Sequence, residues 1–343
     1  MQQLTFIRPG QFEWHDVTRP ALRADTDAIV RPIAVARCDL YFYIATGFVP
    51  YAGPFAFGHE SVAEVVEAGP RAGVSPGQRV VVPFQLSCGE CANCQRGWTN
   101  SCMAFPFGAA YGLKQTSGVD FGGALSALMY VPYAHHMLLP LPDGIDPVDA
   151  ASAGDNIADG WRAVGPHLAL RPGATVLVIG GLVKSVVLYA AGCAVALGAG
   201  RVLYLDDDPD RRARAAALGA SAAPFAEHTD SSEQFDIVVE GHGTAAGLAH
   251  AICATAANGV LTSVSIHLGQ LTPVPLTRAY YKGLTFHTGR VHSRAALPHV
   301  LSCLACGGLH AGRVTHRVAR FADAPGVMDD PGAKLIFTDN DLA

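Results

Sequence analysis

Residues 174–206 read ATVLVIGGLVKSVVLYAAGCAVALGAGRVLYLD, and this stretch decides the fold of the second half of the chain. An apolar run of strand length, 174–180, ends in a pair of glycines. An apolar stretch of helical length follows over 183–198, and a second apolar run, 201–206, ends in an aspartate. Strand, tight glycine turn, helix and strand in this order predict a βαβ unit of the kind that binds dinucleotides.

The same alternation continues beyond residue 206. We expect further strands at 235–241, 259–266 and 283–289, and helices at 209–219 and 244–257. Strands that alternate with helices predict an α/β domain built on a doubly wound parallel sheet. After residue 290 the sequence predicts one more helix, at 294–307, and closing strands such as KLIFT.

The first 150 residues have a different pattern. Short β-branched runs such as EVVEAGP, GQRVVVP and ALMYVPYA are separated by Gly and Pro. Many short strands with tight turns predict a mostly antiparallel, partly barrel-like module. The stretch LPDGIDP, residues 141–147, marks the break before the α/β part.

Length and composition favour a compact protein with two domains. The chain has 343 residues, of which 50% are hydrophobic and 15% charged, and one domain typically takes about 100–200 residues. The formal net charge is −5 and no basic tract stands out, which argues against nucleic acid as a partner. The N-terminal MQQLTFIRPG lacks the pattern of a signal peptide.

Neither a membrane span nor a disulfide framework is expected. The longest apolar stretch, 186–200, is shorter than the about 20 residues that a span requires, and a buried helix explains it better. The chain has nine cysteines, and an odd number without a secretion signal favours a reducing, cytoplasmic location. Cysteines that cluster there are typical of metal sites.

Four cysteines lie within the segment SCGECANCQRGWTNSC, residues 87–102. They are Cys88, Cys91, Cys94 and Cys102. Four thiolates at short spacings can enclose Zn²⁺ in a tetrahedron with no open position, so the sequence predicts a structural zinc. A redox pair formed by Cys91 and Cys94 is the alternative, but it leaves the other two cysteines unexplained.

A second possible metal set is spread along the chain. Cys38 opens the stretch CDLYFY, His59 lies in FGHE beside Glu60, and Asp155 opens the stretch DNIADGW. One thiolate, one imidazole and one carboxylate form a three-ligand zinc set with a fourth position open for water or substrate. Glu60 would adjust the charge of the metal from beside a ligand. Taken singly, Cys38 is more typical of a buried core residue and His59 of a hydrogen-bonded histidine.

With these motifs in place, nearly the whole chain resembles the zinc-dependent medium-chain alcohol dehydrogenases. The resemblance rests on Cys38 with GHE 21 residues further on, on the spacing of the four-cysteine lobe, on DNIADGW, and on the strand–helix order that follows. It implies a GroES-like β-rich catalytic domain (1–155) that carries the zinc lobe (88–102). It also implies a Rossmann nucleotide-binding domain (156–289) and a C-terminal segment (290–343) that returns to the catalytic domain.

The resemblance also implies the chemistry. The catalytic zinc ligands fall on Cys38, His59 and Asp155, and a second, structural zinc falls on the four lobe cysteines. Zinc lowers the pKa of a bound alcohol, and a hydride passes between NAD(H) and an alcohol, aldehyde or ketone. The implied partners are a small-molecule substrate and a second or further copies of the chain, as a homodimer or homotetramer.

One departure from the family concerns proton transfer. Many members have Ser or Thr two positions after the first zinc cysteine, whereas this chain has Leu40, which cannot carry a proton. Tyr41 and Tyr43 occupy positions where relatives often have Asp and His. Asp39, either tyrosine or a water molecule are candidates for the relay, and simple packing is the alternative role for the tyrosines.

A second departure concerns the glycine turn. In the dinucleotide fingerprint G-x-G-x-x-G, the second glycine lets the backbone approach the pyrophosphate and the third allows close packing of strand and helix. Gly180 supplies the first glycine and Gly181 and Val183 the intervening positions, but Leu182 and Ser185 replace the other two glycines. We expect the turn to keep its shape and its ligand, with a weaker affinity.

Three further features bear on the cofactor. Asp206 ends the second strand, where an acid can bind a ribose hydroxyl, and with Asp207 and Asp208 it favours NAD over NADP. Arg211 and Arg212 lie just beyond and would reverse this preference if one of them folded back. Lys334 lies where family members often place a basic residue against the pyrophosphate.

The departures keep two other functions open. Leu40 and Leu182 are compatible with a zinc enzyme on this scaffold that catalyses a non-redox reaction of the lyase, isomerase or cyclase type. They are also compatible with a binding or regulatory protein without activity. Aromatic residues over 42–57 indicate either an apolar substrate pocket or part of the core.

Overall fold

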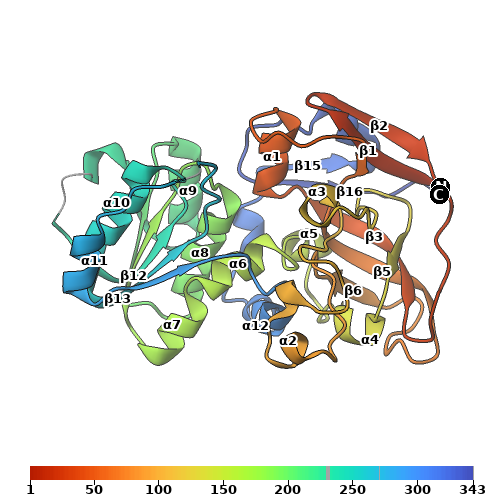
Figure 1. The fold of residues 1–343 in the computed structure, drawn as a ribbon, viewed down its shortest axis with the longest axis horizontal. Coiled ribbons are helices and arrows are strands. Elements are labelled where there is room, and N and C mark those ends of the chain that lie inside the picture. The colour runs from red at the N-terminus through yellow and green to blue at the C-terminus, as the bar shows by residue number, and fades with distance from the viewer. Residues whose placement is uncertain (229–231, 270, 343) are drawn as a thin grey trace. The chain divides into compact units, whose positions relative to one another are not determined.

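The computed structural model describes residues 1–228, 232–269 and 271–342, and it divides into two compact units. The first unit comprises residues 1–158, 291–305 and 315–343, and the second comprises residues 159–290 and 306–314. The second unit is the green and light blue part of the ribbon in Figure 1.

The second unit is built on one sheet of six parallel strands, in the order β11-β10-β9-β12-β13-β14. The strands are β9 (Thr175–Ile179), β10 (Arg201–Leu205), β11 (Ser221–Ala223), β12 (Phe235–Glu240), β13 (Thr255–Ser263) and β14 (Thr285–Thr288). The order reverses between β9 and β12, which is the point where doubly wound sheets bind their ligands. The predicted doubly wound parallel sheet is therefore confirmed.

Helices α8 (Ser185–Ala196), α9 (Pro209–Ala217), α10 (Ala245–Ala254) and α11 (Leu276–Lys282) lie between these strands along the chain. Helices α6 (Asn156–Arg162) and α7 (Gly165–Leu170) precede β9. The carboxylate of Asp208 and the hydroxyl of Thr244 accept backbone N–H groups at the starts of α9 and α10, as expected of helix caps. Strand β11 and helix α11 are absent from the sequence prediction because each is too short to show a periodic pattern.

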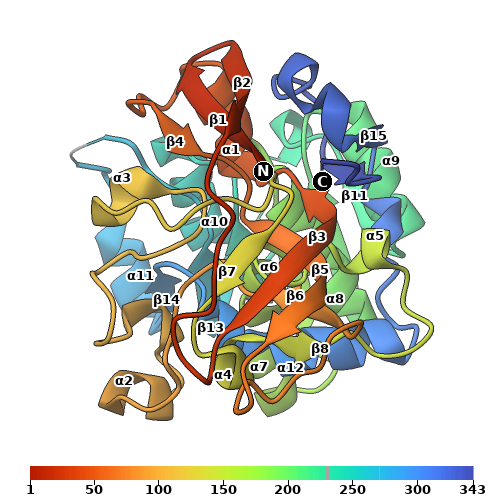
Figure 2. The same ribbon diagram turned by 90° about the vertical axis from the view of Figure 1, so that its right-hand side faces the viewer.

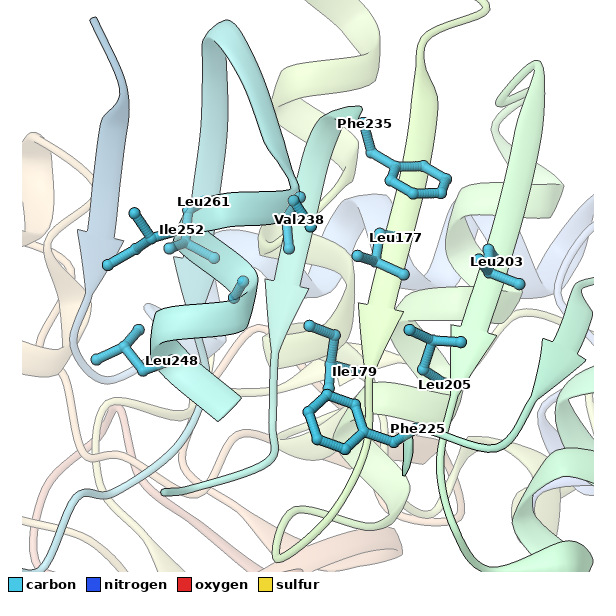
Figure 3. Close-up of a cluster of buried hydrophobic side chains, with 12 residues drawn as sticks. Leu177, Ile179, Leu203, Leu205, Phe225, Phe235, Val238, Leu248, Ile252 and Leu261 are labelled. Atoms are coloured by element: carbon cyan, nitrogen blue, oxygen red, sulfur yellow. The ribbon is translucent and has the colours of Figure 1, made fainter. Parts of the chain in front are cut away.

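A cluster of buried apolar side chains joins the sheet to α10 (Figure 3). Alternate residues of each strand point to the same face of a sheet. Leu177 and Ile179 of β9 therefore meet Leu248 and Ile252 of α10 in this cluster. Its remaining buried members are Leu203, Leu205, Phe225, Phe235, Val238, Ala251, Ala254 and Leu261.

The first unit contains two sheets. A three-stranded antiparallel sheet has the order β2-β1-β4, and a larger sheet has the order β15-β16-β3-β5-β6-β8 with β7 paired to β3. The strands are β1 (Gln2–Arg8), β2 (Gln11–Asp16), β3 (Ala28–Ala36), β4 (Phe55–Ala56), β5 (Glu60–Ala68), β6 (Arg79–Val82), β7 (Met129–Val131), β8 (Leu139–Pro140), β15 (Arg317–Arg320) and β16 (Leu335–Thr338). Strands β3, β5 and β6 lie side by side in Figure 2. The mostly antiparallel pairing agrees with the pattern of the first 150 residues.

Short helices and turns complete the fold. The first unit has α1 (Asp39–Ala45), α2 (Ala92–Gln95), α3 (Lys114–Ser117), α4 (Ala134–Met137), α5 (Pro147–Ala150) and α12 (Ser293–Ala305). Single 3₁₀ turns occur at η1 (Thr99–Ser101), η2 (Ala226–His228), η3 (Ala311–Arg313) and η4 (Phe321–Gly326). Across the residues that the structure describes, every helix is too short or too polar to cross a bilayer.

The cluster on α10 gives a direct test of the second unit. Leu177 is 1% exposed on the central strand, so we expect Leu177→Ala to lower the free energy of unfolding by about 2–5 kcal/mol. Leu170 in α7 is 83% exposed, and Leu170→Ala is the matched control with little expected effect. Urea denaturation of both variants measures the difference. Equal losses would contradict the placement of Leu177 in the core.

Candidate active site

Strand pairing places two distant residues of the chain next to each other. Strands β3 and β5 run antiparallel, and Ala36 at the end of β3 is paired with Glu60 at the start of β5. Cys38 lies two residues after the end of β3, and His59 directly precedes β5. The register of one pair of strands therefore brings the thiol and the imidazole to the same end of the sheet.

Asp155 completes this cluster from the loop that leads into α6. The ligand atoms of Cys38, His59, Glu60 and Asp155 all lie within 4.8 Å of one another, and all four residues are buried. The His59 Nε2 atom lies 3.0 Å from Asp155 Oδ2. The structure thus brings together the four residues that the sequence indicated as the second metal set.

The charges of this cluster suit a divalent cation. Burial raises the pKa of the Cys38 thiol well above its usual range, and the nearby Asp155 carboxylate raises it further. Burial also raises the pKa of Glu60 to about 8, although the ammonium group of Lys334 opposes this effect. Ionised thiolate and carboxylates would place several negative charges together, and a bound cation would balance them. The imidazole, thiolate and carboxylate donors match the ligands that zinc prefers.

Lys334 lies beside this cluster in the first unit. It is 0% exposed, and its Nζ atom donates to Glu60 Oε2 at 3.2 Å and to the carbonyl oxygen of Arg37 at 3.1 Å. Nζ also donates to Asn156 Oδ1 at 2.6 Å. The expected contact of Lys334 with a pyrophosphate stays a prediction, and in the structure its ammonium group contacts Glu60, Asn156 and the Arg37 backbone.

The sequence analysis missed Asn156. This residue follows Asp155 directly, is 3% exposed, and its amide group contacts Cys38 and Asp155. Its position directly after a candidate ligand is a signal of a role in the metal site. The sequence alone does not identify that role, because a polar residue next to a ligand can have many.

The residues proposed for proton transfer lie in different settings. Tyr41 is buried, its hydroxyl donates to the Gly112 carbonyl at 2.9 Å, and the Gly58 N–H donates to it at 3.1 Å. Its ring lies 4.5 Å from the ring of His59. Tyr43 packs against neighbouring aromatic rings of the same segment. The geometry of Tyr41 favours a packing role, because both of its hydrogen bonds go to the backbone.

The four lobe cysteines form a separate cluster. Their sulfur atoms lie within 4.8 Å of one another, and Cys91 Sγ is 3.9 Å from Cys102 Sγ. A disulfide needs about 2.05 Å, whereas a tetrahedral site with Zn–S bonds of about 2.3 Å gives an S–S separation of about 3.8 Å. Hydrogen bonds from the backbone N–H groups of Met103 and Cys94 lower the pKa of Cys91 to about 6. The lobe can therefore hold a closed zinc site.

The glycine turn joins β9 to α8 in the second unit. A side chain on Gly181 would place its Cβ 2.7 Å from the Cα of His242, so close approach requires glycine there. The Leu182 N–H donates to the carbonyl oxygen of His242 at 3.2 Å, and the Val183 N–H donates to that of Gly241 at 2.9 Å. Two donors of the turn are therefore engaged within the unit.

Two side chains of the turn region also have clear positions. Leu182 is half-buried, and its side chain lies close to Gly243. A Cβ atom added to Gly243 would be 2.9 Å from Leu182 Cδ1. A Cβ on Gly180 would lie 2.1 Å from Asp206 Oδ2, so the first glycine makes room for this carboxylate. The leucine lies against Gly243 in the loop after β12 and is not a member of the apolar cluster on α10.

Asp206 has all of its acceptor sites occupied. Arg211 folds back and donates through Nε to Oδ2 at 2.7 Å and through Nη2 to Oδ1 at 2.8 Å. The Tyr204 hydroxyl donates to Oδ2 at 2.8 Å, and the Asp208 N–H donates to Oδ1 at 2.9 Å. A carboxylate offers about four acceptor sites. A ribose hydroxyl would have to displace one of these donors to bind Asp206.

The comparisons with known proteins agree with this geometry. Residues 24–143 match the alcohol dehydrogenase GroES-like domain. A probable zinc-binding alcohol dehydrogenase of Mycobacterium tuberculosis is 32% identical over 300 residues, which cover 84% of this chain and 74% of the relative. A glutathione-independent formaldehyde dehydrogenase of Pseudomonas aeruginosa is 29% identical over 67% of this chain and 60% of its own length.

The solved structures agree as well. The alcohol dehydrogenase from Thermus sp. ATN1 superimposes with a TM-score of 0.89 at 29% sequence identity, over 98% of this chain and 99% of that protein. The GroES-like unit and the Rossmann unit expected from the sequence are thereby confirmed. The resemblance carried by the two metal motifs is confirmed too, and the chain belongs to the zinc-dependent medium-chain alcohol dehydrogenase family.

Proposed function

We propose that Cys38, His59 and Asp155 hold the catalytic zinc ion of this oxidoreductase, and that the four lobe cysteines hold a second, structural ion. The enzyme transfers a hydride between a nicotinamide cofactor and an alcohol, aldehyde or ketone. The observation that carries the proposal is the buried cluster of three different zinc-ligand types within 4.8 Å of one another. The family relationship favours this reaction over non-redox zinc chemistry.

The residues of the cluster have distinct roles in this proposal. When bound, zinc supplies the Lewis acidity that lowers the pKa of an alcohol or polarises a carbonyl group. The thiolate of Cys38, the imidazole of His59 and the carboxylate of Asp155 would bind and orient the ion, since their ligand atoms already lie within 4.8 Å of one another. Glu60 and Lys334 form a buried ion pair beside the ligands, 3.2 Å apart, and set the local charge.

Proton transfer requires a route that does not pass through residue 40. Leu40 has no exchangeable proton, and the Tyr41 hydroxyl is hydrogen-bonded to two backbone groups. We therefore propose that water carries the substrate proton, in place of the side-chain hydroxyl that many relatives use. The apolar character of the segment around α1 supports a small, apolar substrate.

The cofactor is proposed to bind at the carboxyl edge of the parallel sheet, where the order of its strands reverses. The positive end of the α8 dipole favours a pyrophosphate there. NAD remains our proposal over NADP. Because Arg211 pairs with Asp206 and its Nη1 atom also lies 3.7 Å from Asp208 Oδ2, the negative charge that would repel a 2′-phosphate comes mainly from Asp207.

Two further features are proposed from the structure and composition. A homodimer or homotetramer is supported by the exposed edge strand β14 and by the exposed side chains of Leu271, Leu276, Tyr280 and Tyr281 near it. A cytoplasmic location is supported by nine cysteines that form no disulfide.

Metal analysis tests the two sites. Protein purified without chelator should contain two zinc ions per chain. Cys94→Ser removes one lobe thiolate, so we expect it to lose one ion and much of its stability. His59→Ala should lose the other ion and the activity, while circular dichroism shows most of the fold retained. If the wild-type protein holds a single ion and Cys94→Ser loses it, the cluster of Cys38, His59 and Asp155 binds no zinc.

Cofactor choice is tested by titration with NADH and NADPH, followed by nicotinamide fluorescence. We expect NADH to bind more tightly, because the aspartates after β10 repel a 2′-phosphate. Tighter binding of NADPH would instead assign Arg211 or Arg212 to the phosphate. If neither cofactor binds at millimolar concentration, hydride transfer is excluded.

Leu182 is expected to weaken cofactor binding through its side chain. It lies over Gly243 and is not a member of the apolar cluster of Figure 3, so Leu182→Gly should tighten NADH binding by roughly tenfold, or ~1–2 kcal/mol. The added backbone freedom should lower the melting temperature slightly. Leu182→Ala, which keeps the Cβ, should show a smaller gain. A clear loss of melting temperature with unchanged affinity would show that Leu182 serves packing instead.

A further inference from the structure

Asn156 is the first residue of α6, and its side chain lies in the middle of the buried cluster. Its Nδ2 atom is 3.1 Å from Asp155 Oδ2 and 3.5 Å from Cys38 Sγ. These are atoms of two of the three proposed zinc ligands. The same amide nitrogen therefore faces both a sulfur and a carboxylate oxygen.

The orientation of this amide is fixed by charge. The Lys334 ammonium group lies 2.6 Å from Asn156 Oδ1. An ammonium group has only donors and an amide NH₂ group has only donors, so the ammonium can face only the oxygen. The two hydrogens of Nδ2 must then point toward Cys38 and Asp155. The oxygen and nitrogen of this side chain cannot exchange places without setting two donors against each other.

We propose that Asn156 is a positioning residue for the metal ligands, which donates one hydrogen bond to the Cys38 thiolate and one to the Asp155 carboxylate. This inference rests on the proposed zinc site. It adds a residue that joins two ligands to the buried ion pair of Glu60 and Lys334. The same amide holds both ligand side chains in one orientation and withdraws charge from them.

The network explains why an amide is suited to this position. A carboxylate there would satisfy Lys334 but would have no hydrogen to donate, and it would add negative charge beside Asp155. An apolar side chain would leave the Lys334 ammonium without one of its acceptors. An amide provides an acceptor for the cation and two donors for the ligands at the same time.

Cadmium substitution separates the two metal sites in one experiment. The ¹¹³Cd chemical shift depends strongly on the number of sulfur ligands, so the lobe with four sulfurs and the cluster with one sulfur give two resonances. In Asn156→Leu we expect the one-sulfur resonance to move and the four-sulfur resonance to stay. Competition with a chelator should show about 10- to 100-fold weaker zinc binding at the one-sulfur site alone.

Asn340→Leu is the matched control. Asn340 also donates two amide hydrogen bonds within the first unit, to the carbonyl oxygens of Pro32 and Ser126 at 2.9 and 3.0 Å. Its replacement should lower stability without moving either cadmium resonance. If Asn156→Leu does not fold, Asn156→Asp keeps the size of the side chain and the contact with Lys334. This variant lacks the donors, so its one-sulfur resonance should move as well.

The outcomes are distinguishable. A folded Asn156 variant whose two resonances and zinc affinities match the wild type would overturn the positioning role and leave the proposed function intact. A wild-type protein that shows only the four-sulfur resonance would overturn both. A shift of both resonances would also overturn the inference, because it would report a general loss of structure.

Discussion

The burial of ionisable groups around Cys38 is the constraint on which the rest of the first unit depends. A thiol, an imidazole and two carboxyl groups share a space from which water is nearly excluded. Burial favours the neutral forms of acids and thiols, and the raised pKa values of Cys38 and Glu60 express this cost. Such a cluster is stable only where positive charge and hydrogen-bond donors are built in around it.

The surrounding elements supply those groups. Lys334 precedes β16, and the pairing of β16 with β3 holds its ammonium group beside Glu60. Arg37 at the end of β3 donates to the carbonyl oxygens of Met328 and Asp330, which fixes the chain that leads to Lys334. The C-terminal segment is therefore part of the site, and the electrostatics of the cluster depend on its strand pairing.

The second unit shows how far a turn can depart from its usual sequence and keep its shape. Gly180 and Gly181 are retained because Asp206 and the backbone of His242 occupy the space of a side chain. Leu182 replaces a glycine at a position where its side chain can extend over Gly243. The backbone constraint is thus met by the first two glycines, and we propose that the cost of the leucine falls on the ligand rather than on the fold.

The sequence by itself determined the features that depend on neighbours along the chain. The spacing of Cys88, Cys91, Cys94 and Cys102 predicted a metal lobe, because short loops limit where the sulfurs can lie. The order of strands and helices predicted the parallel sheet. Only the tertiary structure decided the contacts of Asn156, Tyr41 and Asp206, because the partners of these side chains come from other elements and depend on strand register and packing. Local sequence restricts the backbone, whereas long-range pairing decides which polar atoms meet.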